Sequence, residues 1–324
     1  MVSMLNDATK VAGLAVRILA LLVLVFVLLY VLTWTNTLKC ERIPGWCNIY
    51  YAIKGRPKIL IAYGDYGLGN PDLLSDILAN PEYVGVRPTV LHIDHINPGN
   101  LKEFDLVIVE RARKMSTEKV KMFIDYANTG GRLVWTGDAA AELENPDNYL
   151  YEDEISFDKN APHRVINPWA RKLNDEAVLL NELLSLEYVD NYCNIKRCSG
   201  NEVLTGSIIP INRENPFVYG ISTSLPLYLA DEMDFAIVKP LAKGTSTTVL
   251  ALDFGSKLFA DGKEYPRTIP FMVANAKGNI VGLKIGENVA YYAMPPEYFA
   301  HPSLSAEHRY FQLIEKMYFG MLYG

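Results

Sequence analysis

The stretch FDLVIVERARKMSTEKVKMFIDYANTGGRLVWTGD (residues 104–138) carries two strand signals, one near each end. Residues 106–109, Leu-Val-Ile-Val, are a short apolar run rich in β-branched side chains, which is typical of a parallel strand buried on both faces. Residues 133–135, Leu-Val-Trp, restart the pattern, and Thr136-Gly137-Asp138 breaks it where a ligand-facing loop is expected. The stretch therefore predicts neighbouring strands of a parallel sheet.

A helix is predicted between these two strands, over residues 116–128. Ser116 can cap its first turn, and the glycines at 130 and 131 can end it, because glycine adopts the left-handed backbone that follows many helices. One apolar face is formed by side chains at i, i+3, i+4 and i+7, namely Val120, Phe123, Ile124 and Ala127. A strand–helix–strand unit is the simplest structure that these signals support.

The same alternation extends toward the amino terminus. Residues 58–63 predict a first strand and residues 89–94 a second one. The loop Gly64-Asp-Tyr-Gly-Leu-Gly69 follows the first strand, and its glycines resemble those of a phosphate-binding loop, although no Walker lysine follows them. Asn70-Pro71 predicts a helix start, with a capping asparagine and proline at the first helical position.

Beyond Asp138 the signals are mainly those of strands. An amphipathic helix is predicted from the spacing of Leu173, Ala177, Leu180 and Leu184, and a last helix is predicted to follow a capping Ser305. Five strands are expected between them, at residues 235–240, 247–254, 271–274, 280–285 and 288–293. The predicted fold class is α/β: a mostly parallel, doubly wound sheet with a β-rich C-terminal extension.

An apolar run of 21 residues without a charge, Ile18 to Leu38, lies near the amino terminus. At about 1.5 Å per residue, a helix of this length spans roughly 30 Å of hydrocarbon, and Trp34 suits an interfacial anchor. A cleaved signal peptide is the alternative, but such apolar cores are shorter and end at small residues. We expect a retained transmembrane helix, whose flanking basic residues leave its orientation open.

Four cysteines follow this run as two close pairs, Cys40 with Cys47 and Cys193 with Cys198. Local pairs predict two disulfides in an oxidising compartment, whereas a four-thiolate zinc site fits their internal gaps poorly. We therefore place the amino terminus in the cytoplasm. The predicted organisation is a cytoplasmic segment (1–17), a transmembrane helix (18–38), a connector (39–57) and an extracytoplasmic domain (58–324) with an excursion at 139–206 and a β-rich completion at 207–324.

Candidate site residues follow from the rule that ligands of parallel sheets bind beyond the carboxyl ends of the strands. The candidates are Asp65, Tyr66, Glu110, Arg111, Thr136 and Asp138. Glu110 and Arg111 form either a ligand grip or a rim ion pair. His92-Ile-Asp94-His95 is the most metal-like stretch, but a strand-end polar cluster is the simpler interpretation. We expect no metal and no cofactor, and the net charge of −6 argues against nucleic acid.

The order of these elements resembles the class I glutamine amidotransferase-like fold, in the branch of trehalose-utilisation-type proteins and related non-catalytic domains. The resemblance rests on residues 104–109, 116–128 and 130–137, and on a late stretch at 286–295. It implies a nucleophilic cysteine after the fourth strand and a downstream His-x-Glu pair. This chain has Thr136-Gly137-Asp138 at that place and no His-x-Glu, so the family's glutaminase activity is not expected.

The sequence thus favours a membrane-anchored, non-catalytic binding or scaffold domain. Protein partners in a membrane or envelope assembly are expected, with a glycan as a further candidate ligand. By resemblance, one non-catalytic subunit of eukaryotic oligosaccharyltransferase has a domain of this type. The alternative is a hydrolase that acts on carbohydrate or envelope material through its acidic rim.

Overall fold

The computed structural model describes residues 2–34, 38, 43–55, 57–144, 149–155, 161–198, 200–213, 215, 217–218, 221, 223–260, 262–275, 279–280, 283–284 and 288–323. The chain forms two compact units, Met1–Arg56 and Pro57–Leu322. The predicted Cys40–Cys47 disulfide lies outside the described side chains.

The first unit contains two helices, α1 (Val2–Trp34) and α2 (Trp46–Lys54). α1 is long and apolar enough to cross a membrane, with its most apolar window at Val16–Thr33. It ends four residues before the predicted boundary at Leu38. Gly45 precedes α2 with a φ of 78°, and Gly55 follows it with a φ of 88°, so glycine permits a sharp turn at each end of this short helix.

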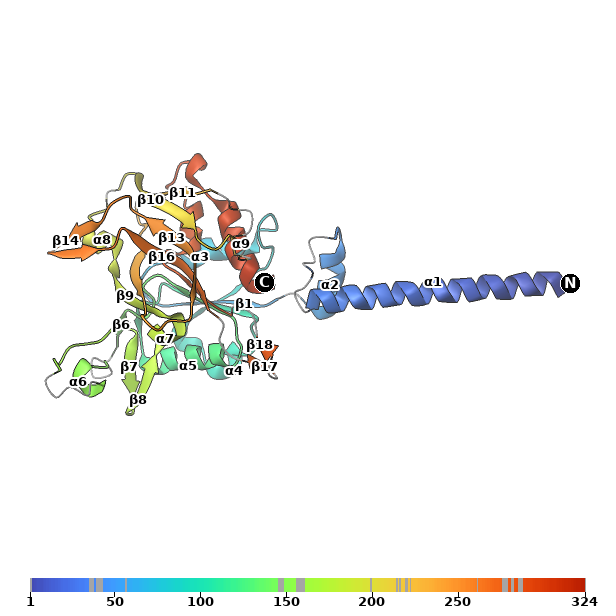
Figure 1. The fold of residues 1–324 in the computed structure, drawn as a ribbon, viewed down its shortest axis with the longest axis horizontal. Coiled ribbons are helices and arrows are strands. Elements are labelled where there is room, and N and C mark those ends of the chain that lie inside the picture. Colours follow the sequence, from blue (N-terminus) through green and yellow to red (C-terminus); the bar gives the residue numbers. More distant parts are fainter. Residues whose placement is uncertain are drawn as a thin grey trace. The chain divides into compact units, whose positions relative to one another are not determined.

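The second unit is built on one nine-stranded mixed sheet, which confirms the predicted α/β class with its β-rich C-terminal region (Figure 1). The sheet order is β11 (Leu225–Leu229), β10 (Val203–Pro210), β13 (Thr247–Asp253), β16 (Thr268–Asn275), β19 (Val289–Tyr292), β5 (Leu133–Thr136), β3 (Leu106–Glu110), β1 (Ile59–Tyr63) and β2 (Thr89–His92). The strands from β19 to β2 are parallel, and those from β11 to β19 pair antiparallel.

Helices cover both faces of the parallel part. In Figure 1, α4 (Pro98–Leu101), α5 (Thr117–Asn128) and α7 (Leu180–Leu184) lie on one side of the sheet, and α3 (Pro71–Ala79) and α9 (Phe311–Tyr323) on the other. The remaining elements are short: η2 (Ile93–His95), β4 (Lys114–Met115), β6 (Glu142–Leu143), α6 (Glu152–Ile155), β7 (Ala170–Leu173), β8 (Glu176–Leu179), β9 (Leu186–Asn191), α8 (Tyr192–Ile195), β12 (Ala236–Pro240), β14 (Leu258–Ala260), β15 (Lys263–Tyr265), β17 (Asn279–Ile280), β18 (Leu283–Lys284), η4 (Pro296–Ala300) and η5 (Ala306–His308).

Two predicted helix starts are confirmed in atomic detail. The Asn70 side chain accepts a hydrogen bond from the backbone N–H of Leu73, and the Ser116 hydroxyl accepts one from that of Lys119. These side chains satisfy backbone donors that have no partner inside the helix. α3 and α5 therefore begin where the sequence predicts.

The predicted amphipathic helix around residues 173–184 is wrong in its first half, which is the hairpin of β7 and β8. Asn174 and Asp175 both have positive φ, 49° and 67°, and such a pair makes a tight hairpin turn. Only α7 remains helical. The apolar spacing was misleading because only Leu180 and Leu184 belong to a buried helix, whereas Ala177 is exposed on the hairpin.

Three smaller expectations also differ from the structure. Ser305 does not cap the last helix: its hydroxyl donates to Glu202, and α9 begins only at Phe311. The second strand ends at His92, where the chain turns into η2. The expected strand at 280–285 is instead split between the paired strands β17 and β18. Short apolar runs do not distinguish one strand from two.

Candidate functional site

The carboxyl ends of β1, β3, β5 and β19 meet at one edge of the parallel sheet. The register pairs Tyr63 with Glu110 and Thr136 with Tyr292, so the chain leaves these strands at one level. Candidate residues from three separate segments are therefore neighbours here. This strand-end site is where a parallel α/β sheet ordinarily binds its ligand.

The loop between β1 and α3 (residues 64–70) lies directly across the strand ends. The backbone N–H of Arg111 donates to the carbonyl of Leu68 at 2.7 Å, and that of Arg113 donates to the carbonyl of Tyr66 at 2.9 Å. A Cβ atom on Gly67 would lie 2.9 Å from the Arg113 nitrogen. The glycine pattern of this loop thus serves close packing of backbone on backbone, which the phosphate-loop interpretation did not foresee.

Three successive backbone amides of this loop donate to side-chain oxygen atoms of the protein. The N–H of Leu68 donates to Asp138 Oδ1 at 2.8 Å, that of Gly69 to the Tyr298 hydroxyl at 3.1 Å, and that of Asn70 to Glu297 Oε1 at 2.8 Å. Consecutive amides at a helix start form the usual cradle for a phosphate or another anion. Here the protein's own oxygen atoms occupy that cradle.

Asp138 is buried, with 1% of its surface exposed. Besides the Leu68 amide, its carboxylate accepts hydrogen bonds from Asn191 Nδ2 at 3.0 Å and from Arg113 Nη1 at 3.4 Å. Each oxygen is therefore engaged by a neighbouring donor. This arrangement positions a structural carboxylate, because a nucleophile or general base needs an oxygen that can reach a substrate.

The turn that follows β5 is held by donors from several directions. The Tyr291 hydroxyl donates to the Gly137 carbonyl at 2.9 Å. The indole N–H groups of Trp135 and Trp169 both donate to the Ala139 carbonyl, at 3.0 and 2.9 Å. Gly137 itself packs under Leu68, which is only 8% exposed. The position that presents the nucleophile in catalytic members of this fold class is thus covered and rigidly held.

We expect Gly137→Ala to destabilise the protein by about 2 kcal/mol. Gly137 has a φ of 56°, and an added Cβ would lie 2.9 Å from the Leu68 Cβ, so both backbone strain and overlap contribute. Chemical unfolding of the full chain in detergent measures the change.

Gly255→Ala is the matched control for this variant, because Gly255 has a φ of 76° but no atom near its added Cβ. It should show the strain alone, and Leu68→Gly, which removes the overlapping Leu68 Cβ, should partly rescue Gly137→Ala. Equal losses for the two glycine variants, with no rescue, would show that Leu68 does not cover the turn.

Glu110 and Glu297 form a buried carboxyl pair beneath the loop, both with 0% exposure. Burial, followed by the charge of Glu297, raises the pKa of Glu110 well above its ordinary value, and burial also raises the pKa of Glu297. Among the described residues, neither oxygen of Glu110 has a hydrogen-bond partner outside this pair. Two such carboxyl groups cannot both ionise readily, so the pair retains a proton at neutral pH. The predicted Glu110–Arg111 ion pair is wrong, because Arg111 is exposed at the surface with a φ of 49°.

The remaining predicted rim residues have ordinary structural partners. Asp65 is exposed, with Oδ1 3.3 Å from His92 Nε2, so part of the metal-like stretch lies in a polar cluster at the end of β2. The Thr136 hydroxyl donates to the Val109 carbonyl at 2.5 Å. Tyr66 is 44% exposed and donates to Glu142. That hydrogen bond, with the charge of Arg113, lowers the pKa of Glu142.

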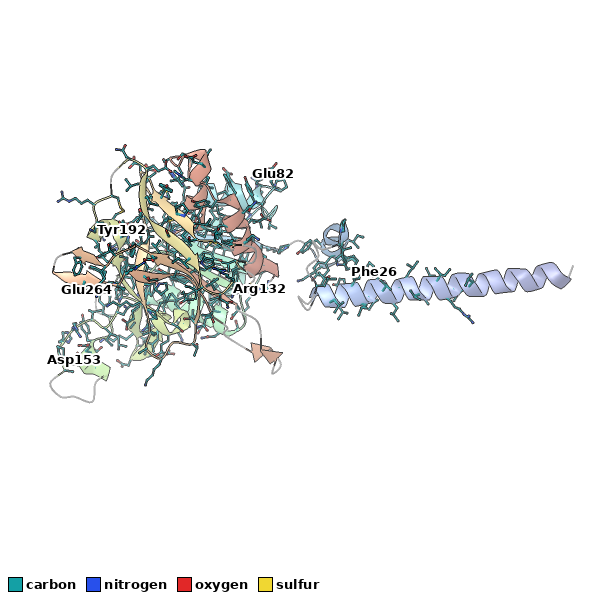
Figure 2. All side chains as sticks on the ribbon, turned by 45° about the horizontal axis from the view of Figure 1, so that its top comes forward. Phe26, Glu82, Arg132, Asp153, Tyr192 and Glu264 are labelled. Atoms are coloured by element: carbon teal, nitrogen blue, oxygen red, sulfur yellow. A yellow bond between two sulfur atoms is a disulfide. The ribbon has the colours of Figure 1, made fainter. Side chains whose placement is uncertain are left out.

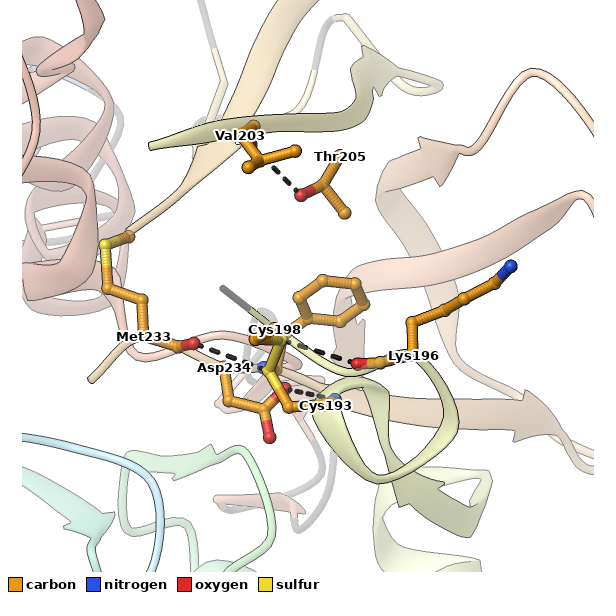
Figure 3. The surroundings of a disulfide bond; sticks show 8 residues. Cys193, Lys196, Cys198, Val203, Thr205, Met233 and Asp234 are labelled. Carbon is orange, nitrogen blue, oxygen red and sulfur yellow. Dashed lines mark hydrogen bonds between the residues drawn. A yellow bond between two sulfur atoms is a disulfide. The ribbon is translucent and has the colours of Figure 1, made fainter. Parts of the chain in front are cut away.

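Cys193 and Cys198 are joined by a disulfide around the short helix α8 (Figure 3). Asp234 lies beside it and accepts hydrogen bonds from the backbone N–H groups of Cys193 and Phe235. Burial raises the pKa of Asp234 to about 7. The two sulfur atoms and this carboxylate lie close enough for a metal site, but the sulfurs are bonded to each other and offer no thiolate. The disulfide fits an extracytoplasmic domain.

Several residues of the strand-end site were missed in the sequence, namely Arg113, Glu142, Asn191, Glu297 and Tyr298. The sequence did give a signal for Glu297 and Tyr298. They follow the stretch at 288–293, which was predicted to be a strand and lies within the late stretch that resembles the amidotransferase-like fold. β19 pairs parallel with β5, so its exit belongs to the same edge of the sheet. No comparable sequence signal identifies Asn191, which arrives from β9.

Comparisons with known proteins bear on the fold. No protein-family model matches the sequence, and a search of curated proteins finds no relative. The structure is similar to a ThuA-like protein from Bacteroides uniformis ATCC 8492, with 14% identity, coverage of 82% of this chain and 92% of that chain, and a TM-score of 0.51.

Two further solved structures are more distant. They are a ThuA-like protein from Parabacteroides merdae ATCC 43184 (11% identity, 82% and 90% covered, TM-score 0.40) and a β-galactosidase from Rahnella sp. R3 (12% identity, 85% and 33% covered, TM-score 0.46). Of the three, the Bacteroides uniformis protein has a similarity that shows a shared fold. The globular unit therefore shares the fold of this ThuA-like protein.

Proposed function

We propose that this chain is a membrane-anchored accessory protein whose extracytoplasmic domain works by binding and carries out no catalysis at its strand-end site. The observation that carries the proposal concerns the backbone amides of residues 68–70, which could bind an anion. They donate instead to Asp138, Tyr298 and Glu297. Leu68 additionally packs over Gly137. A site filled by the protein's own groups supports a role for the fold as a scaffold.

The placement at the membrane follows from two features. α1 supplies one helix that can span a bilayer, and the Cys193–Cys198 disulfide suits an oxidising compartment. Together they support a cytoplasmic amino terminus and an extracytoplasmic globular domain. A long domain can cross the membrane despite the basic residues that follow the span.

Protein partners are favoured over a glycan by the distribution of exposed side chains. Exposed apolar residues lie in or next to the antiparallel part of the globular unit: Val203 (48%), Leu204 (57%), Ile211 (57%) and Phe259 (65%). Such side chains suit a protein interface. Tyrosine side chains could otherwise line a sugar-binding surface, but eight of those described are buried: Tyr50, Tyr126, Tyr188, Tyr265, Tyr291, Tyr292, Tyr298 and Tyr318.

Complementation in cells that lack the wild-type chain tests this proposal. The double variant Asp65→Asn/Tyr66→Phe removes exposed polar groups of the rim, and Leu204→Glu/Phe259→Glu charges two exposed apolar positions. We expect the rim variant to restore the wild-type phenotype and the charged variant to fail. Lys263→Glu, on the same hairpin as Phe259, is the control for a charge change alone.

All variants must first reach the membrane in equal amounts and unfold at the same denaturant concentration. Loss of function in the rim variant, with full function in Leu204→Glu/Phe259→Glu, would contradict the proposal. That pattern would favour the hydrolase alternative, in which the acidic rim contacts substrate.

A further inference from the structure

The helix α2 packs directly onto the last turns of α1. The rings of Trp46 and Phe26 meet edge to face with centroids 5.3 Å apart, and those of Tyr50 and Tyr30 are 5.4 Å apart. The Trp46 indole N–H donates to the Thr33 hydroxyl at 2.8 Å. Figure 2 shows Phe26 on α1 where α2 lies beside it. The two helices thus share a small core, formed by Trp46 and Tyr50 with Leu29, Tyr30, Ile43 and Tyr51.

The α1 partners of this contact belong to the apolar window Val16–Thr33. Phe26 lies seven residues before Thr33, which is roughly 10 Å along a helix. The amino-terminal end of α2 therefore lies beside side chains that a spanning helix would place within the bilayer. The polar atoms at this contact are satisfied without water, since Trp46 donates to Thr33 and Thr33 donates to the Leu29 carbonyl.

Apolar side chains also remain exposed on α2. Ile49 is 48% exposed and Ile53 is 55% exposed, one helical turn apart. At 3.6 residues per turn, both fall within about 60° of Trp46 around the helix axis. The only charged residue of α2 is Lys54, in its last turn. The apolar surface of the span therefore continues onto α2.

We propose that α2 is an interfacial helix, which inserts Ile49 and Ile53 into the acyl boundary of the leaflet at the carboxyl end of the span, with Trp46 packed against α1 beside them. The occupant of this exposed apolar surface is lipid, because the surface is continuous with the lipid-facing side chains of α1. The tyrosines at 50 and 51 suit the headgroup level, and Lys54 reaches toward water at the helix end. This inference rests on the membrane anchoring proposed above.

Fluorescence quenching in liposomes tests the inference on the full chain. A Trp34→Phe background leaves Trp46 as the reporter of α2, because Trp135 and Trp169 are fully buried in the globular unit. The protein is reconstituted in phosphatidylcholine vesicles brominated either near the headgroups or near the chain ends. We expect the Trp46 signal, defined by subtracting a Trp46→Phe variant, to be quenched more strongly by the shallow bromines.

Ile49→Glu/Ile53→Glu should abolish most of this quenching, whereas Ile49→Leu/Ile53→Leu should retain it. Val203→Glu/Leu204→Glu adds the same charge to the globular unit and should leave the quenching unchanged. Flotation of the vesicles after an alkaline wash reports the anchor separately. Flotation with an unquenched Trp46 would overturn the interfacial helix alone, and loss of flotation in the wild-type chain would overturn the membrane anchoring on which it rests.

Discussion

Arg171→Met is expected to destabilise the globular unit by about 4 kcal/mol. Arg171 is fully buried, and its guanidinium donates to four backbone carbonyls: Pro168 at 2.9 Å, Met115 at 2.8 Å, Ala140 at 2.5 Å and Glu142 at 3.1 Å. Burial lowers the pKa of this guanidinium to about 10, so it still carries its charge at neutral pH. Methionine fills similar space but leaves four carbonyls without this donor.

The effect is large because one buried guanidinium donates to three separate segments of the chain. Met115 belongs to β4 and Glu142 to β6, whereas Ala140 lies in the turn beyond β5, to which Trp135 and Trp169 also donate. Arg171 therefore stabilises the turn beyond β5, which is part of the strand-end site. Its loss should also loosen the contact of Leu68 with Gly137.

Chemical unfolding of the full chain, followed by tryptophan fluorescence, measures this prediction. Arg171→Lys should lose nearly as much stability, because one ammonium cannot replace a planar fork of donors. Arg164→Met is the control, since Arg164 is 71% exposed and pairs with Glu152 at the surface. A change in Arg171→Met as small as in Arg164→Met would show that the guanidinium does not hold these segments together.

Glu110→Gln is expected to stabilise the protein by on the order of 2 kcal/mol at pH 8 and to have almost no effect at pH 4. The folded-state pKa of Glu110 is raised above its unfolded value, first by burial and then by Glu297. The folded protein therefore binds a proton that the unfolded chain releases. The contribution of Glu110 to stability is fully present below the unfolded pKa and is lost as pH rises toward the folded pKa.

Glutamine keeps the shape of the protonated carboxyl group and cannot ionise, so it removes this loss. Unfolding free energies of wild type and variant, measured at intervals between pH 4 and pH 8, should diverge as pH rises. Glu103→Gln, at an exposed position, should follow the wild type throughout. A variant less stable than wild type at pH 8 would mean that Glu110 is ionised and held by a partner.

The parallel half of the sheet could be predicted because each of its strands is short, apolar and followed by a helix signal. Ser116 and Asn70 show why the helix starts were also predictable, since a cap depends on residues within one turn. Hairpin β7–β8 was not predicted, because two consecutive left-handed residues outweighed an apolar spacing that looked helical. Helix caps and apolar runs therefore predicted these strands and helix starts. The hairpin is the exception, because the positive φ of Asn174 and Asp175 was not predicted.

The candidate residues lie at one edge of the sheet, but the partners that hold several of them could not be predicted from the sequence. Asp138 and Glu110 were expected to face a ligand, and both are buried against groups distant in sequence. Strand pairings that no local pattern reveals bring Asn191 and Glu297 to this site. Glycines 64, 67 and 69 resemble those of a phosphate loop in the sequence. Their close contacts with neighbouring backbone become visible only in three dimensions.

The central claim is that the protein's own groups close the strand-end site, and amide hydrogen exchange of the full chain in detergent tests it most directly. The N–H groups of Leu68, Gly69 and Asn70 donate to buried side chains, so a peptide covering residues 64–70 should be protected nearly as well as β1 beside it. Exchange of this loop within seconds, while β1 stays protected, would contradict the claim. It would show that the loop opens and exposes Gly137 and Asp138 to a ligand.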